Sequence, residues 1–408
     1  MFDLLILALI GILIGIVTGL TPGLHVNTIA VIGLSLFPAL NLSPIHFGVV
    51  MVSMAVTHTF LDFIPSIFLG APEESTALSI LPTHRLLLQG NAFEAVKLTA
   101  FGSLFGLIFA LILLIPAVMF VPVIYHGLHG IIAYIILLFV IVLFLLERKT
   151  EKILWAVLVF FISGYFGILI FDLKIISPAQ VLFPVFAGLF GLSNILWAII
   201  STKQRSAQRA MKVPQNRFIK IKFDKKFASA GFLGAIGGAV VGIMPAMSPS
   251  QIGILMYSVF GADIRNFIVS ISAINTSDAI YSLAAVYTIG NPRSGVAVMI
   301  SEVIEIDFNT LLLFVGVIAF TAIFATLLHI KIGKLMLKFY DKIDYVTLCA
   351  ASFTLIIILI FIFTGIFGVM IGLLALLIGM LPILSGISRT HVVGVLIFPT
   401  VLYFMGVV

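Results

Sequence analysis

Two carboxylates lie inside segments that are otherwise apolar, and each has polar side chains around it. Asp62 ends the stretch VTHTFLD, and Asp278 lies in INTSDA. A carboxylate within a bilayer is costly, so it usually faces a cavity, a partner or a coupling ion. His58 and Asp62 are four residues apart, which places both on one face of a helix where they could pair. The pattern predicts a site that binds a coupling ion.

The side chains of these two stretches form one candidate set. Hydroxyl, amide and carboxylate oxygens suit coordination of Na⁺, and a carboxylate beside a histidine suits carriage of a proton. A hydrogen-bonded pair with a purely structural role is the alternative. The candidate ion-coupling residues are His58, Asp62, Asn275, Thr276 and Asp278.

A proline interrupts two further apolar stretches, 4–40 and 229–261, and polar residues follow each interruption. A broken helix leaves backbone N–H and C=O groups unpaired, which persists in lipid only where they line a cavity or meet a ligand. A helix that begins at the break offers N–H groups and the positive end of its dipole. Two such ends facing each other would bind an anion without a buried Lys or Arg. Local capping of each helix is the alternative.

The predicted anion site gathers the residues at and after both breaks. In the second stretch, Ser248 and Gln251 fit a capping box at a helix start. Arg293 stands alone between the basic clusters of the chain, which favours a role at the site. The candidate substrate-binding residues are Pro22, Gly23, His25, Asn27, Thr28, Pro245, Ser248, Ser250, Gln251 and Arg293.

The elements that position these residues must lie in a membrane. The chain of 408 residues is 62% hydrophobic and 9% charged, and a soluble domain could not bury that much apolar surface. The net charge of +6 comes from basic residues in short loops, as membrane orientation requires, rather than from a nucleic-acid-binding surface. The single cysteine excludes an intramolecular disulfide. We therefore expect a multi-pass integral protein of the cell membrane.

Apolar runs of about 20 residues predict the membrane spans. They lie at 45–70, 98–122, 128–146, 153–172, 178–200, 265–288, 308–330, 346–364, 366–381 and 387–406. Three basic loops, at 147–152, 203–226 and 331–342, are separated by even numbers of crossings, so all three are predicted to be cytoplasmic. The two broken stretches are predicted to be pairs of half-helices that enter the membrane and return.

The first half of the chain recurs in the second. The residues Gly11, Gly15, Gly19 and Pro22 correspond to Gly234, Gly238, Gly242 and Pro245 at an offset of 223 (245 − 22). The loop charges give the two halves opposite orientations, which is typical of transporters. The predicted fold is all-α, with two inverted-topology repeats, each a broken re-entrant hairpin plus about five transmembrane helices. Residues 1–200 form the first repeat, 201–228 a basic cytoplasmic linker and 229–408 the second repeat.

Several stretches resemble the TctA-like family, the large permease subunit of tripartite tricarboxylate transporters. They are GIVTGLTPGLHVNTIA, LGAPEESTALSILPTHRLLLQGNAFEAVKLTAFGSLFG and, in the second half, INTSDAIYSLAAVYTIGNPRSGVAV. The resemblance covers most of the chain. It implies the permease fold, and it implies two partners, a small membrane subunit and an extracytoplasmic binding protein.

The expected function is secondary active transport of a small organic anion, such as a di- or tricarboxylate, coupled to H⁺ or Na⁺. The sequence contains no Walker A motif, which favours an ion gradient as the driving force. The alternative is a flippase for a phosphate-headed polyprenyl lipid carrier. The sequence also lacks the usual motifs of an intramembrane enzyme. We expect no catalytic residue, no resident metal, no cofactor beyond the coupling ion, and no nucleic-acid partner.

Overall fold

The computed structural model is built of helices, and no strand occurs among the residues that it describes. These are residues 2–21, 26–69, 80–173, 175–176, 178–205, 213–244, 249, 252–253, 256, 263–290, 292, 294–339 and 345–406. The chain divides into two compact units. Unit 1 comprises Met1–Val121 and Thr202–Leu348, and unit 2 comprises Pro122–Ser201 and Cys349–Val408. Each unit therefore draws on both halves of the sequence.

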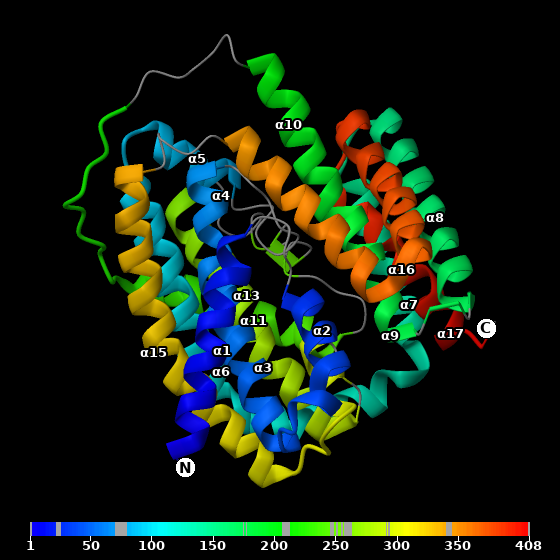
Figure 1. Cartoon of the computed structure of the whole chain (residues 1–408), viewed down its shortest axis with the longest axis horizontal. Coiled ribbons are helices and arrows are strands. Elements are labelled where there is room, and N and C mark those ends of the chain that lie inside the picture. The colour runs from blue at the N-terminus through cyan, green and yellow to red at the C-terminus, as the bar shows by residue number, and fades with distance from the viewer. Residues whose placement is uncertain are drawn as a thin grey trace. The chain divides into compact units, whose positions relative to one another are not determined.

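Unit 1 contains the two glycine-rich helices, which are labelled α1 and α11 in Figure 1, and the polar stretches. Its elements from the first half are α1 (Phe2–Leu20), α2 (Val26–Leu40), α3 (Pro44–Leu61), α4 (Phe63–Leu69), α5 (Ile80–Leu88) and most of α6 (Ala92–Leu128). Those from the second half are α11 (Lys225–Ile243), α13 (Ile264–Ile289), α14 (Gly295–Ser301), α15 (Phe308–Phe339) and the first residues of α16 (Tyr345–Ser385).

Unit 2 contains the remaining apolar helices. They are α7 (Ile132–Leu145), α8 (Thr150–Asp172), α9 (Pro178–Phe186), a π-helical segment (Ala187–Leu192), most of α10 (Ser193–Arg205), the rest of α16 and α17 (Gly394–Phe404). Two short 3₁₀ turns, His129–Ile131 and Arg389–Val393, precede α7 and α17.

The all-α membrane fold predicted from the sequence is confirmed. Among the described residues, nine helices are long and apolar enough to cross a membrane. The two spans predicted at 346–364 and 366–381 form α16, which turns at Gly365 with a left-handed φ of 65°. Beyond the turn, a Cβ on Gly372 would lie 3.2 Å from Ile360. The two arms of α16 therefore fold back on each other, as a separation into two spans requires.

The predicted break in the first glycine-rich stretch is also confirmed. Helix α1 ends at Leu20 and α2 begins at Val26. A contact of 3.1 Å between His46 and Asp3 places the start of α3 beside the start of α1, while the re-entrant hairpin itself stays a prediction. With 19 residues, α1 is about 28 Å long. Helix α1, and likewise α11 with 19 residues, is thus a full-length helix rather than the half-helix predicted, because each glycine-rich run stays helical through Leu20 or Ile243.

Helix α1 packs along α3 through its glycines. A Cβ on Gly15 would lie 2.6 Å from Cβ of Thr57, and one on Gly19 would lie 2.8 Å from Cβ of Leu61. Small residues of this kind let helix backbones approach closely in lipid. This line of glycine contacts, the glycine seam, brings the end of α1 against the end of α3.

Helix α11 packs along α13 in the corresponding way. A Cβ on Gly238 would overlap the hydroxyl of Ser277, and one on Gly242 would lie 2.7 Å from Cβ of Tyr281. Gly238 follows its counterpart Gly15 in the sequence by 223 residues (238 − 15). The residue that it contacts, Ser277, follows the Thr57 that Gly15 contacts by 220 residues (277 − 57). The same packing therefore occurs once in each half of the chain.

The order of contacts along neighbouring helices gives their relative directions. Helices α3 and α15 run in the same direction, since Gly48 contacts Phe314 and Phe60 contacts His329. Helices α6 and α13 also run in the same direction, since Gly102 would meet Val269 and Gly106 would meet Ala273. Helices α6 and α15 run in opposite directions, since Val96 lies at Gly333 and Thr99 at His329. Helices α1, α3 and α15 run one way, and α6, α11 and α13 run the other. The predicted topology requires these directions, while the inverted repeat itself stays a prediction.

Candidate functional site

Helix α3 ends beside Asp62, and the chain resumes at once in α4. The sequence explains this interruption, because Pro65 has no N–H to donate to the carbonyl of Leu61. The last carbonyls of a helix lack partners in their own helix and take donors from elsewhere. The interruption thus creates acceptors inside the bundle, beside an Asp62 side chain that is 1% exposed.

Asn275 supplies donors to this interruption. Its side-chain amide donates to Oδ2 of Asp62 over 2.9 Å and to the carbonyl of Thr59 over 3.3 Å. Asn275 is buried, and it lies near the middle of α13, away from both helix ends. Two predicted ion-coupling residues from different halves of the chain are therefore in direct contact.

His58 lies one turn before Asp62, on the helix face that its spacing predicts. Its Nδ1 is 3.0 Å from the hydroxyl of Thr18, and the imidazole also interacts electrostatically with Asp62. Thr18 belongs to the last turn of α1 and was not foreseen as part of the site. It ties the helix that ends at the first break to the polar pair on α3.

Asp278 forms the corresponding pair in the second half. The hydroxyl of Ser282, one turn later, donates to Oδ1 of Asp278 over 3.0 Å. The Ser282 backbone nitrogen would lie 2.9 Å from a Cβ on Gly242, so the pair lies beside the end of α11. Two residues before Asp278 in the sequence, the hydroxyl of Thr276 is buried and has no hydrogen-bond partner in the described part of the chain.

The two pairs occupy corresponding positions. The offset of 220 that relates the glycine contacts also relates His58 to Asp278 (278 − 58) and Asp62 to Ser282 (282 − 62). Each glycine-rich helix therefore ends against the backbone of two polar residues that are one helical turn apart. In the first half they are a histidine and an aspartate, and in the second an aspartate and a serine.

The predicted anion-binding residues lie mostly outside the described residues. This holds for Pro22, Gly23, His25, Pro245, Ser248, Ser250, Gln251 and Arg293. Asn27 and Thr28 are described in backbone only, and they fall in the first turn of α2. That is where a helix presents its N–H groups, so the anion site stays a prediction.

A buried histidine on α15 was missed by the sequence reasoning. His329 is 0% exposed, and its ring bridges the hydroxyl of Thr99 and the carbonyl of Phe60. An ionisable residue inside an apolar span was the available signal. At the starts of α6 and α13, Glu94 and Arg265 form a two-pronged ion pair, with one contact of 3.2 Å.

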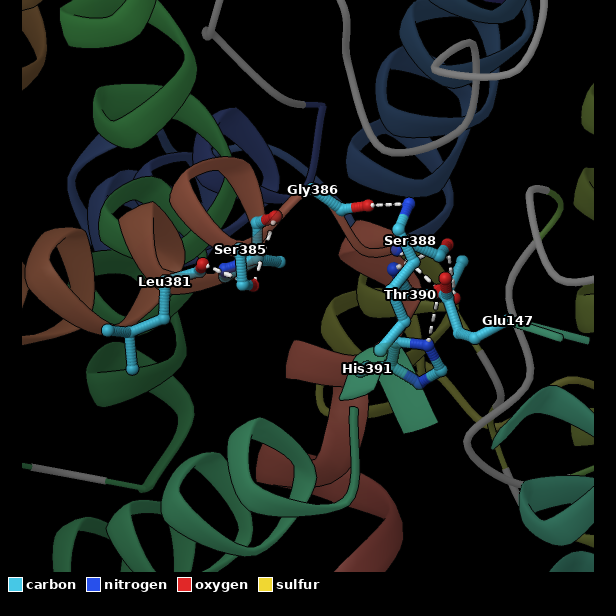
Figure 2. A network of polar contacts seen from close by, with 9 residues as sticks. Glu147, Leu381, Ser385, Gly386, Ser388, Thr390 and His391 are labelled. Atoms are coloured by element: carbon cyan, nitrogen blue, oxygen red, sulfur yellow. Dashed lines mark hydrogen bonds and ion pairs between the residues drawn. The ribbon is translucent and has the colours of Figure 1, made fainter. Parts of the chain in front are cut away.

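Unit 2 has a separate polar network at the start of α8 (Figure 2). The Glu147 carboxylate accepts from the backbone N–H of Ser388 over 2.6 Å and lies 3.0 Å from Nε2 of His391. Arg389 donates to the carbonyl of Leu189 and to the hydroxyl of Ser193, over 3.1 and 2.8 Å. These contacts fix the turn before α17 against the π-helical segment, and they have the character of structural contacts.

Interrupted helices with carboxylates buried beside the interruptions are typical of membrane transport proteins. Residues 5–394 match the family described as the tripartite tricarboxylate transporter TctA family, and the chain belongs to that family. It is 31% identical over 415 residues to an uncharacterized protein of Methanocaldococcus jannaschii, with 99% of this chain and 100% of that protein covered. No solved structure matches. The resemblance seen in the sequence is confirmed, and the protein is a multi-pass integral membrane protein of the tricarboxylate-transporter type.

Proposed function

We propose that this protein is a secondary permease for a small organic anion of the di- or tricarboxylate class, coupled to H⁺ or Na⁺. The observation that carries the proposal is the hydrogen bond of 2.9 Å from Asn275 to Asp62. It joins the two halves of the chain at an interrupted helix, and the family to which the chain belongs is described as tricarboxylate transporters.

The buried carboxylate supplies the coupling. A carboxylate inside a membrane protein is stable when it is neutralised by a proton, a cation or a donor. Binding or release of a proton or cation at Asp62 alters the strength of the hydrogen bond that Asn275 donates to it. Since that bond connects α3 to α13, binding of the ion changes the contact between helices of opposite direction. The corresponding pair, Asp278 with Ser282, would respond in the same way beside the second break.

The anion would bind at the breaks themselves. Asn27 and Thr28 lie in the first turn of α2, where backbone N–H groups favour a negative ligand. Ser248, Ser250 and Gln251 would provide donors from the second break, and Arg293 would provide a cation. Neutral donors select an anion by geometry and avoid the cost of burying several cations in lipid.

The family description also supports two partners. Members are components of tripartite transporters, so we expect a small membrane subunit and an extracytoplasmic binding protein to act with this chain. The permease would then receive its anion from a soluble protein rather than from bulk solution.

Uptake into proteoliposomes tests the proposal. The purified chain is reconstituted alone and with its partners, and uptake of radiolabelled citrate and succinate is measured under an imposed H⁺ or Na⁺ gradient. We expect Asp62→Asn and Asp278→Asn to abolish gradient-driven uptake. The matched control is Asp224→Asn, because Asp224 caps α11 through the N–H of Phe227 and asparagine caps a helix equally well.

Two results would overturn the proposal. Normal uptake by both carboxylate variants would make the carboxylates structural. Protection against thermal unfolding by a polyprenyl phosphate, with none by any carboxylate, would replace the permease with a lipid flippase.

A further inference from the structure

His329 lies at the crossing of three helices from both halves of the chain. It belongs to α15, and its ring is fully buried between α3 and α6. Nδ1 contacts the carbonyl of Phe60, in the last turn of α3, and Nε2 lies 3.0 Å from the hydroxyl of Thr99 on α6. The proposed function has not used this group.

The partners of the ring determine where its protons lie. A carbonyl oxygen only accepts, so Nδ1 must donate to Phe60 and must carry a hydrogen. In the neutral ring, Nε2 is therefore an acceptor, and the hydroxyl of Thr99 donates to it. Both ring nitrogens are then satisfied.

The same atoms also satisfy the protonated ring. The hydroxyl of Thr99 lies 3.0 Å from the carbonyl of Ala95 and 3.1 Å from that of Val96. When Nε2 gains a proton it donates to the Thr99 oxygen, and the Thr99 hydroxyl turns to one of these carbonyls. Every N–H and O–H keeps a partner, and no heavy atom moves. A hydrogen bond to each N–H of the protonated ring lowers the cost of burying its charge, which is largest for an ion without such partners.

We propose that His329 is a proton-binding site of the permease, which takes up and releases a proton at Nε2 through rotation of the Thr99 hydroxyl. The inference rests on the proposed function, because a coupling proton requires a transport cycle. Phe60 is two residues before Asp62, so the site adjoins the interruption of α3 that Asn275 occupies. The proton site and the proposed ion site thus share one helix end.

The charged and titratable groups on the surrounding elements set the electrostatic background. They are Asp3 on α1, His46, His58 and Asp62 on or at the end of α3, Glu94, Lys97, Tyr125 and His126 on α6, Arg265, Asp278, Tyr281 and Tyr287 on α13, and Lys331, Lys334 and Lys338 on α15 itself; α4 has none. In the described part of the chain, the imidazole interacts with the hydroxyl of Thr99, the carbonyl of Phe60 and the backbone of Val96. The proton is therefore held by hydrogen bonds rather than by a carboxylate.

Nitrogen NMR of the protein in nanodiscs tests the site directly. Histidine is ¹⁵N-labelled, and the ring signal that disappears in His329→Gln is followed from about pH 4 to about pH 9, around the ordinary range of histidine. We expect Nε2 to change reversibly from a bare to a protonated nitrogen while Nδ1 stays protonated. We expect Thr99→Val to move this change by about one pH unit toward acid, since the protonated ring loses its acceptor. A ring that stays neutral over the whole range would overturn the proposal.

Transport separates this inference from the proposed function. In proteoliposomes, His329→Gln should reduce pH-gradient-driven citrate uptake about tenfold, as expected for loss of a hydrogen-bonded buried proton site. Citrate exchange at equal pH on both sides should continue, because it moves no net proton. If the native chain transports no carboxylate in either mode, the proposed function fails. If His329→Gln keeps full gradient-driven uptake, the inference alone fails.

Two control variants exclude a general effect of substitution. His46→Gln removes a histidine at the start of α3, where its partner is Asp3. Thr326→Val removes a buried hydroxyl that donates within its own helix, to the carbonyl of Ala322. Both should keep the His329 titration and the pH-driven uptake. Loss of either in these variants would show that the readouts report folding rather than the proton site, and would overturn the inference.

Discussion

His58 on α3 and Asp278 on α13 occupy corresponding places in the two halves of the protein, at an offset of 220 (278 − 58). The carbonyl oxygen of His58 would lie 3.1 Å from a Cβ on Gly19, and the backbone nitrogen of Asp278 would lie 3.0 Å from a Cβ on Gly238. The backbone of each residue thus lies against a glycine-rich helix, and the residue is a histidine in the first half and an aspartate in the second. The packing of the helix beside α1 and of the helix beside α11 is alike, while the residue at this position differs in its chemistry.

We predict that Asp62 and Asn275 are energetically coupled. Asp62→Asn leaves at most a neutral acceptor and Asn275→Leu removes the donor, so each loses the charge-assisted hydrogen bond, which typically contributes about 1.5–3 kcal/mol. In a double-mutant cycle on the free energy of unfolding, the double variant should therefore be less destabilised than the sum of the two single variants. Denaturant titration in mixed micelles measures the effect. Strictly additive values would show that this contact contributes nothing.

We predict that the glycine seam tolerates no side chain. Gly15→Ala would place a Cβ 2.7 Å from the carbonyl of Met54, and overpacking of this kind typically costs about 1–3 kcal/mol. The control is Gly316→Ala, because an added Cβ there meets nothing within 4 Å. The single cysteine, Cys349, is buried, so a thiol-reactive dye reports thermal unfolding of each variant. Equal melting temperatures for the two variants would contradict the close packing of α1 on α3.

We predict that Glu147 stabilises unit 2. Glu147→Ala removes the acceptor for the Ser388 N–H and the partner of the buried His391. Loss of partners for buried donors should cost roughly 2–3 kcal/mol, seen as a lower melting temperature in the same dye assay. Glu151→Ala, an exposed residue in the first turn of α8, should change stability by less than about 0.5 kcal/mol. A similar loss in both variants would refute a specific role for Glu147.

We predict the sides of the membrane from the loop charges. Cysteines placed at the exposed Lys149 and Lys334 should react with a membrane-impermeant maleimide only after the cytoplasmic side is opened. A cysteine at the exposed Glu305 should react from outside in intact cells. Labelling of Lys149→Cys and Lys334→Cys from opposite sides would contradict the predicted even number of crossings between their loops.

The positions of most helices were predictable from the sequence, but several ends were not, since the span predicted at 98–122 is the longer α6 and the span predicted at 45–70 is interrupted at Asp62. Apolar runs of span length, basic loops and prolines act locally, so they gave the break after Leu20 and the turn at Gly365 before any packing was known. The same local signals placed His58 and Asp62 on one helix face. Glycine spacing also predicted the close approach of α1 and α11 to neighbouring helices, although it did not identify those neighbours.

Only the tertiary structure decided which polar groups meet. Asn275 and His329 belong to the second half of the chain, and their partners belong to the first. Asn275 reaches Asp62, and His329 reaches Phe60 and Thr99. The choice of partner depends on helix directions and on the depth at which each helix crosses its neighbours, and neither is encoded by local spacing. A polar residue within an apolar segment of the sequence must have a hydrogen-bond partner in the fold, because lipid supplies none. Which partner it finds is settled by packing of the whole unit.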